Sequence, residues 1–351
     1  MAAPALLRSL ITAPGPSGYE TAPANVWREA ASEFAEVATD NLGSVTARVP
    51  GTADGPTLVI VGHIDEIGLI VTHIDDEGFL RFVGVGGWDA QILVGQRIEV
   101  ITREGSLPGV IGKKPIHLLK DEERKKVAEI KDLHIDLGAK DGEEARKLVR
   151  IGDVAVIAGD SVDLPNRRLA SRSLDNRLGA YVALTAAKLV ADAGGALGDV
   201  VAAAVVQEEI TFAGAHTTAF SLEPDLAVVV DVTHATDAPG IDVNELGKHP
   251  LGSGPVVARG STLNPRVTEG LYETAEAEKI PITLEASARG TGTDADAIHL
   301  NRAGVPTGVV SIPLRYMHSP VELVALDDVE ACARLIAAYA RGLDPGASFE
   351  R

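Results

Sequence analysis

The chain has 351 residues, of which 45% are hydrophobic and 23% charged, a length that predicts two units and a composition typical of soluble proteins. The formal net charge of −18 disfavours nucleic acid and anionic membranes as partners, because both would be repelled. We expect a cytoplasmic protein, because no apolar run approaches the ~18 to 20 residues of a membrane span and the N-terminus lacks the basic start of a secretory signal.

The first part of the chain predicts a helix followed by a short buried strand. Residues 21–36 have helical periodicity, and residues 57–62 form an apolar run that ends directly before His63. Residues 78–160 differ, because short β-like runs such as 96–102 alternate with glycines. One helix interrupts them, where Asp141 and Glu144 have capping-box spacing.

From about residue 175 onward, predicted strands and helices alternate. The predicted helices are 178–190, 265–278 and one from about 327 towards 342, and the predicted strands are 200–206, 226–230 and 307–312. This alternation predicts an α/β fold whose mostly parallel sheet is flanked by helices. We therefore divide the chain into a catalytic α/β domain, residues 1–69 and 165–351, and an inserted small β-rich domain, residues 70–164.

Five candidate metal ligands stand after predicted strands or at a helix start. They are His63, Asp175, Glu209, Asp231 and His318. Each alone is more often an ordinary polar group at a strand end or, for Asp175, a helix cap. The carboxyl ends of parallel strands meet at one edge of a sheet, so the five together predict a site for two metal ions. Nitrogen and oxygen ligands without thiolates favour zinc, cobalt or manganese.

Two further acidic residues complete the predicted site. Glu208 precedes Glu209 at the end of a very apolar run, and we assign it as the general base, because water between metal ions needs a free carboxylate to receive its proton. Asp65 follows His63 with the spacing of a carboxylate that orients a metal-binding imidazole, although such spacing alone is a weak signal. His234, three residues after Asp231, is expected to line the pocket.

Other chemistries find little support in the sequence. The glycine-rich segments 84–87 and 290–292 match neither the dinucleotide fingerprint nor the phosphate-binding loop. No nucleophile elbow of the Gly-x-Ser-x-Gly type is present. The single cysteine, Cys332, excludes an intramolecular disulfide and fits a small buried helix residue.

A series of motifs along nearly the whole chain resembles metallopeptidase family forty-two, the tetrahedral, glutamyl or deblocking aminopeptidases, whose relatives are sometimes labelled cellulase M. The motifs occupy residues 62–68, 85–89, 109–117, 173–177, 207–209, 234–240, 292–296 and 317–322. Two features depart from the expected pattern: Thr211 replaces an expected glycine, and the loop 246–255 is longer than usual. Both departures concern the enzyme's preference for the N-terminal residue of its peptide substrate.

The resemblance implies a specific arrangement of the site. One ion takes His63, Asp175 and Asp231, and the other takes Asp175, Glu209 and His318, with Glu208 as the base and Asp65 orienting His63. His234, Thr293 and Asp294 are expected to contact the substrate. The resemblance also implies that the inserted domain mediates dimerisation and that dimers assemble into a hollow dodecamer.

The leading hypothesis is a metal-dependent aminopeptidase that hydrolyses N-terminal residues from peptides. One alternative is a glycoside hydrolase, which needs two carboxylates across a glycosidic bond and no metal. The other is a non-catalytic, peptide-binding assembly protein that keeps the site as a relic. The preferred N-terminal residue, the native metal and the oligomer size remain open at this point.

Overall fold

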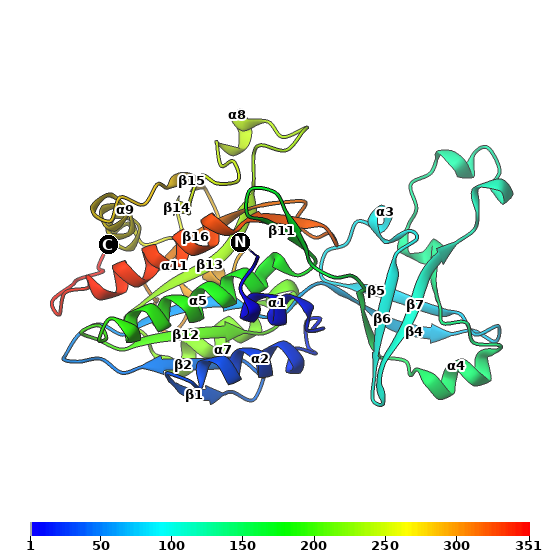
Figure 1. Cartoon of the computed structure of the whole chain (residues 1–351), viewed down its shortest axis with the longest axis horizontal. Helices are drawn as coiled ribbons and strands as arrows, with labels where there is room; N and C mark the ends of the chain where they lie inside the picture. The colour runs from blue at the N-terminus through cyan, green and yellow to red at the C-terminus, as the bar shows by residue number, and fades with distance from the viewer. Residues whose placement is uncertain (1) are drawn as a thin grey trace.

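The structure is a computed structural model that describes residues 2–351, so residue 1 of the predicted segment 1–69 lies outside it. A large α/β domain holds both chain ends, and a smaller β-barrel stands beside it (Figure 1). The predicted fold class is confirmed: a sheet flanked by helices, with a β-rich insertion.

The centre of the large sheet is parallel. Its four central strands run in the order β12 (Val200–Val205), β3 (Leu58–His63), β13 (Leu226–His234) and β16 (Thr307–Arg315). His63 at the end of β3 is level with Val205, and β13 runs parallel to both of its neighbours. The carboxyl ends of these strands therefore form one edge, as the sequence predicts.

Antiparallel strands extend this centre on both sides into an 11-stranded sheet. One edge is formed by β1 (Glu36–Thr39) and β2 (Val45–Val49), and the other by β17 (Glu322–Ala325), β11 (Arg168–Ser171) and β10 (Val162–Leu164). In addition, β14 (Val256–Gly260) pairs antiparallel with β16 and parallel with β15 (Thr283–Ser287). The sheet is thus mixed, with its parallel part at the centre, and not mostly parallel as the sequence predicts.

Helices cover both faces of the sheet because successive side chains of the central strands point to opposite faces. In β3, Leu58 and Ile60 belong to the larger core, and Val59 and Val61 to the smaller one. The larger core includes α1 (Ala5–Thr12), α2 (Thr21–Ala31), α5 (Leu174–Asp192), α9 (Pro265–Ala277) and α11 (Leu326–Arg341). The smaller core includes α7 (Ala213–Leu222) and α10 (Ala295–Ile298). The short helices α6 (Glu208–Thr211) and α8 (Val243–Leu246) lie in connections.

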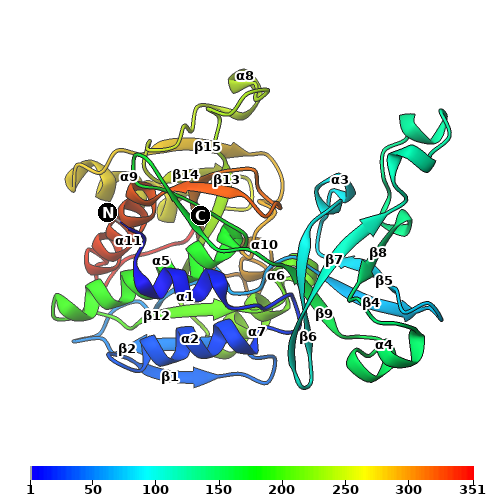
Figure 2. The ribbon, with the colours of Figure 1, turned by 45° about the vertical axis from the view of Figure 1, so that its right-hand side comes forward.

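The smaller domain is a closed barrel (Figure 2). It has its own apolar core. Its strands are β4 (Gly68–Ile74), β5 (Leu80–Val85), β6 (Arg97–Thr102), β7 (Gly105–Lys113), β8 (Leu133–Asp136) and β9 (Val154–Ile157). The helices α3 (Ala90–Leu93) and α4 (Gly142–Leu148) flank it, and three 3-10 turns, Ile116–Leu118, Glu123–Lys125 and Ile130–Asp132, lie in a projecting arm between β7 and β8. The exact domain boundaries stay a prediction, and β10, within the predicted insertion, pairs in the large sheet.

Several element boundaries differ from those expected: the helix predicted for residues 178–190 begins at Leu174, for example, and the strand predicted for residues 307–312 continues to Arg315. Two further cases have a clear physical reason. The first long helix, predicted for residues 21–36, ends at Ala31, because the following residues turn into β1, which pairs with β2. Asp40 closes that hairpin by accepting backbone hydrogen bonds from residues 42–44. The strand predicted for residues 226–230 continues to His234, because it pairs with β16 over its whole length.

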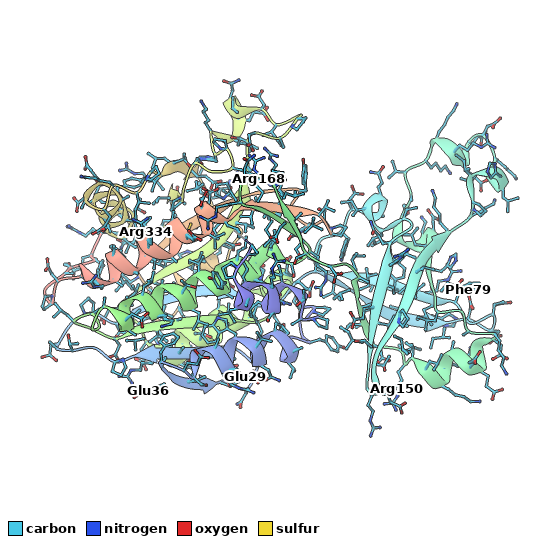
Figure 3. All side chains as sticks on the ribbon, viewed as in Figure 1. Glu29, Glu36, Phe79, Arg150, Arg168 and Arg334 are labelled. Carbon is cyan, nitrogen blue, oxygen red and sulfur yellow. The ribbon has the colours of Figure 1, made fainter. Side chains whose placement is uncertain are left out.

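Labelled side chains of both domains are visible in the side-chain view. Figure 3 places Glu29 and Glu36 near the edge formed by α2 and β1, and Phe79 in the barrel, where its ring packs against His134 at a centroid distance of 4.9 Å. Within residues 2–351, no helix combines the length and apolar character needed to cross a bilayer.

Gly62 provides a test of the packing that positions the site. A Cβ at Gly62 would lie 2.2 Å from the carbonyl carbon of Gly179 in α5, whereas a Cβ at Gly159 would meet nothing within 4 Å. Because neither backbone can yield easily, we expect Gly62→Ala to lower the Tm by about 4 °C or more. Differential scanning calorimetry measures the shift, with Gly159→Ala as the control. Equal Tm values for the two variants would contradict this packing.

Candidate metal centre

His63 lies at the end of β3 and faces two carboxylates. Its side chain is buried, and its Nε2 atom is 3.3 Å from Oδ1 of Asp175 and 3.6 Å from Oε2 of Glu208. The strand ends here because Ile64 leaves the β3 ladder, although its N–H still donates to the carbonyl of Val205. The imidazole therefore points along the edge formed by the carboxyl ends of the strands.

Asp175 lies between two imidazoles. Its Oδ1 atom faces His63, and its Oδ2 atom is 3.4 Å from Nε2 of His318. The same Nε2 atom of His318 is 3.3 Å from Oε2 of Glu209. Thus Asp175 presents one carboxylate oxygen to each histidine, which is the arrangement of a carboxylate shared by two sites.

Asp231 joins the cluster from inside β13. The sequence places it just after a strand, but β13 continues for three residues beyond it, so its side chain projects from the strand itself. One atom each of His63, Glu208 and Asp231 lie within 4.8 Å of one another, as do atoms of His63, Asp175 and Glu209. All five predicted ligands therefore converge with Glu208 at one place.

Asp65 holds the segment that carries the two glutamates. Its Oδ1 atom accepts the backbone N–H of Glu208 and its Oδ2 atom that of Glu209, each at 3.1 Å. Ser17 donates to the same carboxylate at 2.5 Å. Nδ1 of His63 lies 3.4 Å from Oδ1 of Asp65 without hydrogen-bond geometry. The contacts of Asp65 thus fix the position of Glu208 and Glu209 more directly than that of His63.

Two residues that position the ligands were not predicted from the sequence. Glu322, buried at the start of β17, accepts the backbone N–H of Asp175 at 3.0 Å and that of His318 at 2.9 Å. The carbonyl oxygen of Gly87, in the loop after barrel strand β5, is 3.0 Å from Nδ1 of His318. If Nδ1 carries the proton, Nε2 is left as the ligand atom. Both residues lie within motifs that carry the family resemblance, the only signal that could have indicated them.

Burial and like charges shape the titration of the cluster. Burial raises the pKa of Glu208 to about 10, and the nearby Asp231 carboxylate adds to this. Burial likewise raises the pKa of Glu209 and of Asp231. Burial also acts on Asp175, but its two histidine neighbours outweigh it and lower the pKa of this carboxyl group. The pKa of His318 rises to about 11 beside Asp175 and Glu209.

The donor set fits divalent cations. Buried carboxylates stay ionised only beside compensating positive charge, and here four of them converge on two imidazoles. Oε1 of Glu209 is buried without a hydrogen-bond partner among the described residues. Imidazole nitrogens and carboxylate oxygens are ligands that zinc, cobalt and manganese accept.

A cavity of about 420 Å³ opens onto this cluster. His234 and Thr293, both predicted to contact substrate, line it. Asp294, the third predicted contact, is fully buried beside the cluster and does not line the cavity; burial raises its pKa to about 7. A larger cavity of about 860 Å³ lies near Asp225 and Thr307, where β13 and β16 begin, and includes no residue of the cluster.

Known proteins resemble this chain over almost its whole length. The model of a family described as M42 glutamyl aminopeptidase matches residues 43–335. A lysyl aminopeptidase of Pyrococcus furiosus is 36% identical over 349 residues, which covers 97% of each protein.

Solved structures show the same fold. A TET aminopeptidase from a marine sediment archaeon of the Thaumarchaeota superposes with a TM-score of 0.92 at 39% identity, covering 97% of this chain and 96% of that one. The TET1 peptidase of Pyrococcus horikoshii, described as assembling into a tetrahedron or a large octahedral shell, has a TM-score of 0.85 at 34% identity, covering 96% and 99%.

Replacing Glu322 tests whether it positions the two ligands that it contacts. In Glu322→Gln, one carboxylate oxygen becomes an NH₂ group that cannot accept a backbone N–H. We expect zinc or cobalt affinity to fall by about 10-fold to 100-fold while the fold is kept. Calorimetric titration of metal-free protein measures this, with the exposed Glu33→Gln as control. Unchanged affinity in Glu322→Gln would show that the site does not depend on this carboxylate.

Proposed function

Because this chain belongs to the M42 glutamyl aminopeptidase family and is an aminopeptidase, we propose that it removes N-terminal residues from peptides at a centre of two divalent metal ions. The observation that carries this proposal is Asp175, whose two carboxylate oxygens face His63 and His318 separately. Zinc or cobalt suits this ligand set best, with manganese as the third choice.

Each ion has its own proposed ligands. His63, Asp175 and Asp231 would hold one cation, and Asp175, Glu209 and His318 would hold the other. The contacts of Asp175 with both histidines, of Glu209 with His318 and of Asp231 with His63 support these two sets. When bound, the cations supply Lewis acidity that polarises the scissile carbonyl and makes water easier to deprotonate.

Glu208 is the proposed general base. Its carboxylate lines the cavity, and its backbone is held by Asp65, so its side chain faces the space where a peptide carbonyl would lie. In this role Glu208 takes the proton of the attacking water and passes it to the leaving amine. Asp65 is proposed to orient His63 and to fix the backbone positions of Glu208 and Glu209.

Peptides are the proposed substrates, with His234 and Thr293, which line the cavity, as contacts; Asp294 is buried behind this lining and is no longer proposed as one. A glycoside hydrolase would need two carboxylates on opposite sides of a sugar bond, without metal. Here the carboxylates instead surround two imidazoles, which favours the peptidase. A non-catalytic role is disfavoured because every proposed ligand and Glu208 are in place.

We also propose that the chain forms a homo-oligomer in which residues 70–164 mediate dimerisation and dimers assemble into a dodecamer. The barrel and its arm expose several large apolar side chains, which are costly to leave in water. They are Val83, Val110, Ile116, Leu118 and Val127. The tetrahedral and octahedral shells described for the TET1 peptidase support the homo-oligomer part of this proposal.

The proposed mechanism predicts a specific loss of activity. Metal-loaded protein should hydrolyse aminoacyl anilides, and chelation should abolish this. Glu208→Gln should lower kcat by about 100-fold to 10,000-fold, because the proton acceptor is lost. Elemental analysis should show an unchanged metal content in this variant, because Glu208 is not a proposed ligand. Activity that survives both treatments would rule the mechanism out.

The proposed assembly predicts a particle much heavier than the 36.6 kDa chain. Light scattering coupled to size exclusion measures its mass. The double variant Ile116→Asp, Leu118→Asp should have a lower particle mass, because it places charge on the exposed arm. Leu300→Asp, at an exposed apolar residue outside the barrel, is the control. A wild-type mass near that of one chain would contradict the proposal.

A further inference from the structure

The cavity beyond the metal cluster carries an unbalanced negative charge. Among its lining residues, Glu285 is the only carboxylate outside the proposed metal site, and no lysine or arginine lines the cavity within the described chain. Two divalent cations would formally balance the charges of Asp175, Glu208, Glu209 and Asp231. Glu285 would then dominate the electrostatics of the remaining wall.

Glu285 is held at a defined place relative to the site. It lies half-buried on β15, and the hydroxyl of Thr233 donates to its Oε1 atom at 3.2 Å. Thr233 is two residues beyond Asp231 on β13, so both side chains project from the same face of that strand. At a rise of ~3.3 Å per residue, Thr233 lies about 7 Å further along the strand than Asp231. Glu285 thus marks the far side of a pocket that begins at the metal cluster.

We propose that this pocket receives the side chain of the N-terminal residue and selects lysine and arginine through Glu285. This inference rests on the aminopeptidase function proposed above and specifies which class of N-terminal residue the enzyme prefers. Phe212 and Met317, also in the lining, offer apolar surface for the aliphatic stem of such a side chain. The cationic head group then reaches the Glu285 carboxylate, which is fixed by Thr233.

An acidic N-terminal residue meets the opposite situation. Its carboxylate would face Glu285 with no lysine or arginine in the described lining to compensate. Like charges at short range in a partly buried site disfavour binding. Family membership alone does not decide this preference, because the pocket wall rather than the metal ligands contacts the variable side chain.

The test compares substrates that differ mainly in charge. Lysyl, arginyl, norleucyl and glutamyl anilides are assayed with the metal-loaded protein, and norleucine serves as the uncharged reference of similar length. We expect kcat/KM to follow the order lysyl or arginyl, then norleucyl, then glutamyl. Glu285→Gln should lower the lysyl-to-norleucyl ratio by about 10-fold. Glu285→Lys should raise glutamyl relative to lysyl cleavage.

A matched control and a second readout complete the design. Glu276→Gln, at an exposed position of α9, should leave the ratio unchanged. Calorimetry of free L-lysine and L-norleucine should show tighter binding of lysine to the wild-type protein, a measurement that needs no turnover.

The outcomes separate this inference from the function on which it rests. If norleucyl substrate is cleaved but Glu285→Gln leaves the ratio unchanged, or if glutamyl substrate is preferred, the specificity inference is wrong and the aminopeptidase proposal stands. Should Glu285→Gln fail to fold, wild-type binding that is no tighter for lysine than for norleucine overturns the inference. If metal-loaded protein cleaves none of the substrates, both proposals fail.

Discussion

The metal centre depends on one constraint: a single buried carboxylate, Asp175, stands between two imidazoles that come from distant parts of the chain. His63 ends strand β3, and His318 follows β16, yet each lies within 3.4 Å of a different oxygen of Asp175. Such a concentration of buried charge is unfavourable without positive charge to balance it. β3 and α5, which carry His63 and Asp175, approach each other closely at Gly62 and Gly179.

Both domains contribute to this centre. Asp65 and Glu322 hold the backbones of four site residues from within the large domain, while Gly87 in the loop after a barrel strand reaches the ring of His318. A shift of the barrel would therefore alter the orientation of His318. This link gives the inserted domain a structural connection to the site in addition to its proposed role in assembly.

The sequence predicts the part of the molecule that local pattern determines. Apolar runs ending at His63 and before Glu208 indicate buried parallel strands, and their shared edge brings the candidate ligands together. The antiparallel edge strands escape this reasoning, because their pairing depends on contacts between segments far apart in sequence. Gly87 likewise acts through a backbone carbonyl, which leaves no side-chain signal. Glu285 gains its place only because the folded sheet brings its carboxylate to Thr233 on β13, a contact between residues far apart in sequence.

The most direct test of the central claim is anomalous diffraction from crystals of zinc-loaded or cobalt-loaded protein, recorded at the absorption edge of the metal. Two strong peaks in each subunit, one on either side of Asp175 and both clear of the Glu208 carboxylate, are the result that the account predicts. A single peak, peaks away from this carboxylate, or direct coordination by Glu208 would contradict the shared-carboxylate centre.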